Sequence, residues 1–300
     1  MRMTIEFNCP KCGALIAFDS KHAGRRARCL TCGQKLIIPS ESFKKPEKVA
    51  PEPERPAEPV PGFYRAVFVD NSKLFVDPKN ATTLVFVVAV VCFRFFLAQG
   101  ACCLNHVTTI VTWGWLFGFY LNVIYQTAFD DDVLPEIYIG TLGTSVWYAA
   151  YPLLIFGLTL AFVELPFFIA LWLVQDWGVT MSNFFSSVGP VYLLLQFCFL
   201  LGLFLFPSAI LTTAVGKDIA LLRPDYLLAP VVHAFAPHVT CVVLLAAACF
   251  LQTQAGQYTG AHPIATALYL ALNLLVQVVA IFAMRAIGLL YRHYACCFKW

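Results

Sequence analysis

Four cysteines near the start of the chain have the spacing of a metal site. They are Cys9, Cys12, Cys29 and Cys32, in the pattern Cys-x2-Cys-x16-Cys-x2-Cys. This pattern is typical of zinc bound by four thiolates, and iron in the same cage is the alternative. Because sulfur closes all four positions, the ion would be structural rather than catalytic. Residues 1–8 lack the basic-then-apolar run of a secretory signal, so we expect these thiols to stay in the reducing cytoplasm.

The residues around the cysteines predict a small β unit. A glycine, Gly13 or Gly33, follows each Cys-x2-Cys pair and allows the tight turn that brings two sulfurs onto one ion. Short β-prone runs follow at residues 15–18 and 35–38. A polar unit of roughly 40 residues buries little apolar surface, so metal binding would supply most of its folding free energy. We therefore expect a zinc ribbon over residues 1–40.

Basic residues gather between the two cysteine pairs. The segment 21–28 contains Lys21, Arg25, Arg26 and Arg28. Such a segment is attracted to anionic surfaces, including lipid headgroups and phosphate backbones. It holds no aromatic side chain on which a base could stack, so nucleic acid is not the expected partner. We expect the ribbon to bind a cytoplasmic protein instead.

Residues 7–13, residues 23–33 and the closing residues 37–39 together resemble a bacterial zinc-ribbon family. The similarity includes the four cysteines, the glycines that follow them and the final proline, Pro39. The chain departs from the family at Leu30, where a second Cys-Pro is common; this position is not a metal ligand. The resemblance implies zinc binding at the amino terminus of an otherwise unrelated membrane protein, and it implies no particular activity.

The rest of the chain has the composition of a membrane protein. Hydrophobic residues make up 60% of the 300 residues and charged residues 12%, against about 25% charged in soluble domains. The proline-rich residues 41–62 predict an extended linker. Residues 63–80 mix apolar and charged side chains, which predicts a segment at the inner membrane interface. Residues 81–300 would then form a transmembrane helical domain.

The apolar runs after residue 80 are long enough to cross a bilayer. They lie near residues 81–103, 107–129, 145–175, 188–214, 236–254 and 264–290. The third contains Glu164 and Pro166, so it is either one kinked span or a broken one. If it is one span, the positive-inside rule is obeyed by four basic residues, Lys217, Arg223, Arg292 and Lys299. We expect about six spans in the cytoplasmic (inner) membrane, with both termini in the cytoplasm.

Besides Arg285, which lies near the inner end of the last span, two charged residues lie within the expected spans. Arg94 falls slightly past the centre of the first span and Glu164 slightly past the centre of the third, which places them at a similar depth. An isolated charge at such a depth costs ~3 kcal/mol or more, so we expect the two to form an intramembrane pair. The pair would be structural or part of a transport path. A structural role is favoured, because transport sites gather more polar groups or an unwound helix.

No catalytic pattern accompanies these features. The chain has no Gly-x-Ser-x-Gly elbow, no phosphate-binding glycine loop and no His-Glu-x-x-His helix, so we do not expect an enzyme. Residues 120–124, 134–136, 206–210 and 285–292 resemble a family of uncharacterised bacterial polytopic membrane proteins, over roughly residues 75–300. That resemblance implies a multi-span helical domain and brings no activity.

The sequence therefore predicts a small β zinc ribbon followed by an all-α polytopic transmembrane helix bundle of about six spans. The expected function is that of a membrane-anchored interaction or scaffold protein that recruits a cytoplasmic partner through the ribbon. A transporter or lipid-handling protein with a regulatory ribbon is the alternative.

Overall fold

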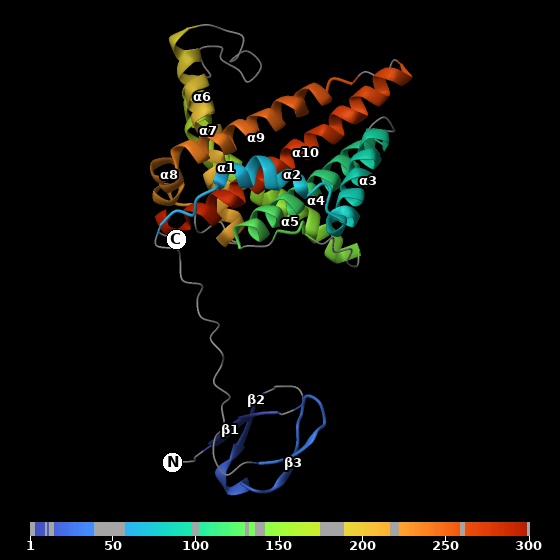
Figure 1. The fold of residues 1–300 in the computed structure, drawn as a ribbon, viewed down its shortest axis with the longest axis vertical. Coiled ribbons are helices and arrows are strands. Elements are labelled where there is room, and N and C mark those ends of the chain that lie inside the picture. Colours follow the sequence, from blue (N-terminus) through green and yellow to red (C-terminus); the bar gives the residue numbers. More distant parts are fainter. Residues whose placement is uncertain are drawn as a thin grey trace. The chain divides into compact units, whose positions relative to one another are not determined.

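A computed structural model describes residues 4–9, 11, 15–38, 58–97, 102–129, 132–135, 142–174, 189–216, 222–258 and 262–298. The chain divides into two compact units, Met1–Glu54 and Arg55–Trp300. Figure 1 shows the first as a small β structure and the second as a bundle of helices. We refer to them as the amino-terminal unit and the helical unit.

The amino-terminal unit consists of two β-hairpins. Strand β1 (Thr4–Asn8) pairs antiparallel with β2 (Leu15–Asp19), and β3 (Arg26–Arg28) pairs with β4 (Lys35–Ile37). The predicted β runs at 15–18 and 35–38 correspond to β2 and β4. A 3-10 turn at Ser20–His22 follows β2, and the Asp19 side chain accepts a hydrogen bond from the Lys21 amide at its start.

The registers of the two hairpins place the cysteines in their turns. Asn8 is opposite Leu15 and Arg28 is opposite Lys35, so Cys9 lies in the connection between β1 and β2, and Cys29 and Cys32 lie in the connection between β3 and β4. Gly33 has a φ of 70°, and its amide donates to the carbonyl of Cys29 over 2.9 Å. This left-handed conformation is the one that glycine adopts most readily, and it closes the second turn.

The helical unit begins with short turns and continues with long helices. The short elements are α1 (Phe63–Arg65), a π-helical turn at Ala66–Asp70, α2 (Asn71–Lys73) and 3-10 turns at Pro78–Asn80 and Ala295–Cys297. The longer helices are α3 (Ala81–Leu97), α4 (Cys102–Ala128), α5 (Leu142–Val163), α6 (Leu165–Val174), α7 (Pro190–Gly216), α8 (Pro224–His233), α9 (Phe235–Ala255) and α10 (Pro263–Tyr294).

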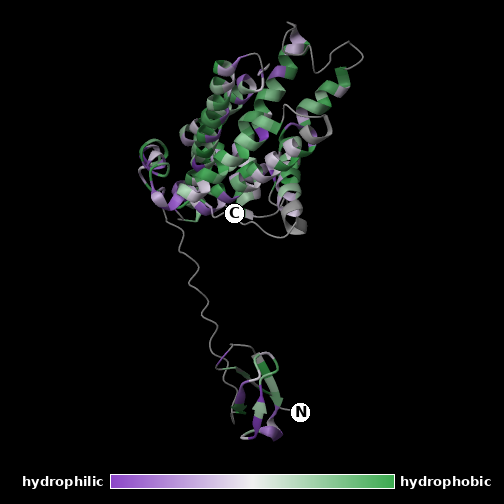
Figure 2. Cartoon of the chain, turned by 90° about the vertical axis from the view of Figure 1, so that its right-hand side faces the viewer, coloured by the Kyte–Doolittle hydropathy of each residue, from purple (hydrophilic) through white to green (hydrophobic). Residues whose placement is uncertain are grey.

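Five of these helices are long and apolar enough to cross a membrane: α3, α4, α7, α9 and α10. Helices α5 and α6 pass the same test together but are bent by 60° at Glu164, so they form either a sixth, broken span or a re-entrant segment. The helices carry hydrophobic residues over most of their length (Figure 2), and α3 exposes Val85, Phe93 and Phe96. Large apolar side chains on the outside of a bundle fit a membrane protein, and the expected six spans remain a prediction.

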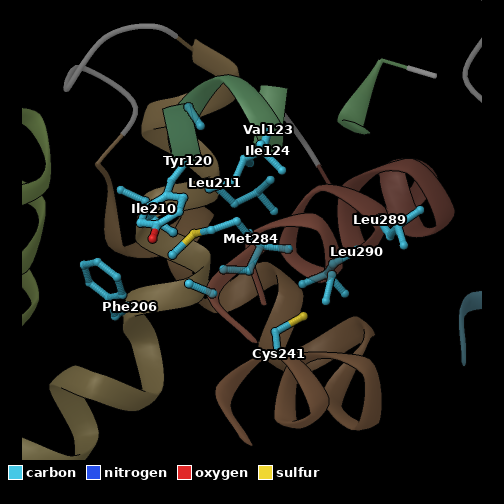
Figure 3. Close-up of a cluster of buried hydrophobic side chains, with 14 of the residues drawn as sticks. Tyr120, Val123, Ile124, Phe206, Ile210, Leu211, Cys241, Met284, Leu289 and Leu290 are labelled. Carbon is cyan, nitrogen blue, oxygen red and sulfur yellow. The ribbon is translucent and has the colours of Figure 1, made fainter. Parts of the chain in front are cut away.

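The core of the helical unit lies where α4, α7, α9 and α10 meet. Helix α10 packs against both α9 and α4, and α7 contacts α4, α5, α6 and α9. Figure 3 shows the buried side chains of this cluster. They include Tyr120, Val123, Ile124, Phe206, Ile210, Leu211, Cys241, Met284, Leu289 and Leu290.

Residues 60–80 form a strap that packs against the carboxy-terminal half of α10. The Val60 amide donates to the carbonyl of His293 over 2.9 Å, and His293 Nδ1 donates to the carbonyl of Val60 over 2.8 Å. Phe63 lies edge-on to the His293 ring, and Phe63 and Val67 are buried in the core. The segment expected at the membrane interface thus contributes side chains to the bundle core.

Candidate metal centre and buried charges

Three cysteine sulfurs converge between the two hairpin turns of the amino-terminal unit. The Sγ atoms of Cys9, Cys29 and Cys32 all lie within 4.8 Å of one another. Cys9 and Cys29 are each only 2% exposed, and they pack in a small core with Ile5, Phe7, Leu36 and Ile38. The fourth predicted ligand, Cys12, lies outside the described residues. These three cysteines could hold a metal ion.

The sulfur geometry fits a tetrahedral thiolate site. Cys9 Sγ and Cys32 Sγ are 3.7 Å apart. Two sulfurs that each lie about 2.3 Å from one zinc at a tetrahedral angle are separated by about 3.8 Å. A disulfide would instead bring them to about 2.05 Å. Among the described residues, no other group of three His, Cys, Asp or Glu side chains lies close enough to share an ion.

Asp19, at the end of β2, is paired with Lys21. Lys21 Nζ lies 3.1 Å from Asp19 Oδ2, and the Lys21 amide lies 3.3 Å from Asp19 Oδ1. The hydrogen bond from the Lys21 side chain, followed by that from its backbone, lowers the pKa of Asp19 below its usual value. The turn that connects β2 to β3 is therefore held by a carboxylate that stays ionised at neutral pH.

Arg94 interacts with an aromatic ring. Its guanidinium carbon lies 4.7 Å from the centroid of the Trp113 ring, in a cation–π geometry. Helix α3, which carries Arg94, packs against α4 and α10, and Trp113 belongs to α4. The charge of the half-buried Arg94 is thus partly compensated by the π-face of the Trp113 ring on the neighbouring helix.

Glu164 lies in a different part of the bundle, at the break between α5 and α6. Its side chain is 3% exposed, and neither carboxyl oxygen accepts or donates a hydrogen bond within the described residues. A Cβ built on Gly202 of α7 would lie 2.6 Å from Glu164 Cδ, so the carboxyl group sits directly against the α7 backbone. The structure therefore does not join Glu164 to Arg94 by a hydrogen bond, because α6 packs on α7 while α3 packs on α4 and α10.

The buried arginine that does pair is Arg285. Its side chain is 5% exposed, and its Nη2 donates to Asp132 Oδ1 over 2.8 Å. Arg292 donates to the same oxygen over 3.0 Å. Arg285 lies near the inner end of the last expected span, residues 264–290, and no sequence pattern names a partner for it. The signal that could have found one is the acidic segment before the third span, which contains Asp132.

His238 is a second polar residue that no sequence pattern singles out. It is fully buried, and its Nε2 donates to the carbonyl of Phe204 over 2.9 Å. With Nε2 as donor, Nδ1 is the acceptor for the Ser208 hydroxyl at 3.3 Å. These bonds join α9 to α7 next to Pro207, and they satisfy both ring nitrogens inside the bundle.

Two of the cavities formed by the described residues of the helical unit are lined by polar as well as apolar side chains. One, of about 460 Å³, is lined mainly by α4 and α5, including Trp115, Asn122, Tyr125, Tyr148 and Tyr151. The other, of about 730 Å³, lies between the strap and α10 and is lined by charged residues that include Asp70, Lys73, Asp132, Arg285 and Arg292. Neither of these two cavities is lined by Arg94 or Glu164.

The chain matches no family model, and no curated protein or solved structure is significantly similar to it. The assignment of a metal centre therefore depends on this chain's own cysteines and on their convergence in the structure.

Proposed function

We propose that the protein is a membrane-anchored zinc-ribbon protein whose amino-terminal unit recruits a cytoplasmic protein partner. The observation that carries the proposal is the convergence of Cys9, Cys29 and Cys32 in a unit separate from an apolar helix bundle. A closed thiolate site stabilises a fold and does not supply a reactive metal. Its role would therefore be to hold a binding surface in shape.

The proposed ion is one structural zinc, bound by Cys9, Cys12, Cys29 and Cys32. Cytoplasmic thiols are kept reduced, and soft thiolate ligands select zinc or iron over hard cations. Elemental analysis of the purified protein tests this directly: about one zinc per chain is expected. Cys29→Ser should remove the metal, whereas Cys249→Ser, in the helical unit, should not. Iron in place of zinc would overturn the identity of the ion but not the site.

The amino-terminal unit presents a basic surface on its second hairpin. Arg26 is opposite Ile37 and Arg28 is opposite Lys35 in the register of β3 and β4, and all four side chains are exposed. Ile37 is 64% exposed, and Leu30 in the adjoining turn is fully exposed. Three cations around an exposed isoleucine suit a partner whose surface is acidic and carries an apolar patch.

Copurification from membranes tests the recruitment. The full chain should retain a cytoplasmic protein that a variant without residues 1–40 loses. A triple variant, Arg26→Gln, Arg28→Gln and Lys35→Gln, separates the surface from the metal, because it leaves every cysteine in place. If the set of bound proteins is the same for all three forms, the recruitment proposal fails.

The proposed location is the cytoplasmic (inner) membrane, with both termini in the cytoplasm. The support is the distribution of basic residues, which favours the cytoplasmic side for the segment between α7 and α8 and for the segment after α10. Protease added outside intact cells should leave the amino-terminal unit uncut, while protease added to inverted vesicles should remove it. Cleavage in intact cells would contradict the orientation.

A lipid-handling or transport function is the second candidate. The cavity of about 460 Å³ favours it, since aromatic residues of α4 and α5 surround a space that also contacts Asn122 and Thr213. Apolar walls with a few polar groups are typical of ligand pockets. A photoactivatable phospholipid in nanodiscs should crosslink to residues 148–155. Crosslinks distributed evenly over all lipid-facing helices would remove this candidate.

A further inference from the structure

Glu164 is chemically isolated within the part of the bundle that contains it. The sequences of α5, α6 and α7 contain no Asp, Glu, Lys, Arg or His. The other titratable side chains on these helices are Tyr148, Tyr151, Tyr192 and Cys198, and none of these residue types forms a cation. Helix α9 adds His238, whose two ring nitrogens are bonded to Ser208 and to the Phe204 carbonyl. Within the described residues, no cation or hydrogen-bond donor compensates the carboxyl group of Glu164.

Because the Glu164 carboxyl group has no partner among the described residues, its protonated form fits this site better than its ionised form. A carboxylate that loses its water and gains neither a hydrogen bond nor a counterion is strongly destabilised, and in practice such a group takes up a proton. The carboxylic acid carries no charge and can occupy an apolar site as a polar but neutral group. The packed arrangement of α5, α6 and α7 is therefore compatible with the protonated form of Glu164.

The local backbone connects this carboxyl group to helix packing. Glu164 lies at the 60° bend between α5 and α6, and Pro166 cannot donate the helical hydrogen bond that would close on the Phe162 carbonyl. On the other side, the carboxyl group rests on Gly202, where any larger residue would collide with it. If Glu164 ionises, its carboxylate must be solvated by water or paired with a cation. The missing helical hydrogen bond at the α5–α6 bend is the place where the backbone can move to admit either one.

We propose that Glu164 is a proton-binding site inside the membrane-spanning bundle, occupied by a proton when α5, α6 and α7 pack as they do here. Release of the proton is coupled to loosening of the contact between the α5–α6 bend and Gly202. The ligand of the site is the proton itself. The site is independent of the amino-terminal unit and of the partner that this unit binds.

A hydrophobic carbodiimide tests the protonated state on the full chain in nanodiscs. The carboxylic acid adds across one C=N bond of dicyclohexylcarbodiimide: the carboxyl oxygen bonds to the central carbon, the proton passes to nitrogen, and nothing leaves. The O-acylisourea then rearranges to a stable N-acylurea, which mass spectrometry locates. We expect an adduct on Glu164 at pH 6 to 7 that declines towards pH 9, and none at that position in Glu164→Gln. Asp132, whose exposed carboxylate is paired with arginine, is the internal control and should stay unmodified.

Thermal unfolding supplies a second readout that does not depend on reagent access. Glu164→Gln mimics the neutral acid, so its melting temperature should change little between pH 6 and 9 beyond the changes due to the rest of the chain. The wild type should lose stability relative to this variant as the pH rises, because ionisation destabilises the packed state. Parallel melting curves across the range would overturn the proposal. An unmodified Glu164 at pH 6, or stabilisation of the wild type by sodium ions at pH 9, would overturn it as well.

Discussion

Arg285 donates a hydrogen bond to Asp132 across 2.8 Å, and this pair joins α10 to a loop that lies 153 residues earlier in the chain. The Arg285 side chain is almost completely buried, while that of Asp132 is 64% exposed. Neighbouring bonds hold the loop as well, since the Leu134 amide donates to Asn80 Oδ1 over 2.9 Å. The buried charge of Arg285 in α10 thus requires a partner, and its bond to Asp132 helps to fix the position of the loop that contains Asp132.

Asp132→Ala should destabilise the helical unit measurably. It removes the acceptor of a buried guanidinium, and the loss of a hydrogen bond to a charged group costs about 1–3 kcal/mol. The matched control is Asp70→Ala, which breaks the exposed pair with Lys73 at 2.6 Å and should change stability little. Thermal unfolding in detergent compares the two, and equal melting temperatures would show that Arg285 does not depend on Asp132.

Gly288→Ala should weaken the packing of α10 on α4. A Cβ at this position would lie 2.7 Å from both the Ile124 carbonyl oxygen and Thr127 Cβ. Overpacking of a tight helix contact typically costs about 1–3 kcal/mol. Gly256→Ala is the control, since the nearest atom to its Cβ, the Thr253 carbonyl oxygen, is 3.5 Å away. Unfolding monitored by circular dichroism should separate the two variants.

Removal of the metal should unfold the amino-terminal unit and leave the helical unit intact. Among the described residues of the smaller unit, the buried core consists of six, two of which are the cysteines Cys9 and Cys29. Without the ion this core is too small to hold the two hairpins together. Protease should then cut within residues 4–38 after treatment with a chelator, while the melting temperature of the bundle stays the same. Resistance to cleavage after complete loss of metal would show that the hairpins fold without it.

The turn at Ser20–His22 should respond to acid through Asp19. Because its pKa is lowered, mainly by the Lys21 side chain, the stability that this carboxylate contributes is present at neutral pH. It is lost as the pH falls through the lowered pKa. Lys21→Ala should move the Asp19 titration upwards, towards the usual value of an aspartate. Carbon-detected NMR of the zinc-loaded full-length protein measures the midpoint, and an unchanged midpoint in the variant would contradict the assigned cause.

The sequence was informative where spacing alone determines geometry. Two Cys-x2-Cys pairs predicted the convergence of sulfurs, and Cys9, Cys29 and Cys32 do lie together. The apolar runs likewise predicted the positions of α3, α4, α7, α9 and α10, although α10 extends to Tyr294, beyond the expected end at residue 290. Hydropathy does not place that end, because a charged residue such as Arg292 continues the helix once it has a partner.

The expected pairing of Arg94 with Glu164 stays a prediction, and it depends on more than spacing along the chain and depth in the membrane. A similar depth in the membrane is necessary for two side chains to meet, but the order in which helices pack around the bundle decides whether they do. The guanidinium of Arg94 lies over the Trp113 ring of the adjacent helix α4. A search for oppositely charged residues does not predict such a cation–π contact. Strand β1 was not predicted from the sequence, because it is only five residues long and its alternating pattern contains just two buried apolar residues, Ile5 and Phe7.

The strap between Val60 and Asn80 makes the order of synthesis matter. Its partner His293 lies 233 residues further along the chain, so the first segment of the bundle has no place to dock until the last helix has been inserted. A chain that stops early leaves Phe63 and Val67 uncovered. Exposed apolar side chains of this kind are what chaperones and proteases recognise. The contact between the strap and α10 would thereby tell chaperones and proteases that α10 has been inserted.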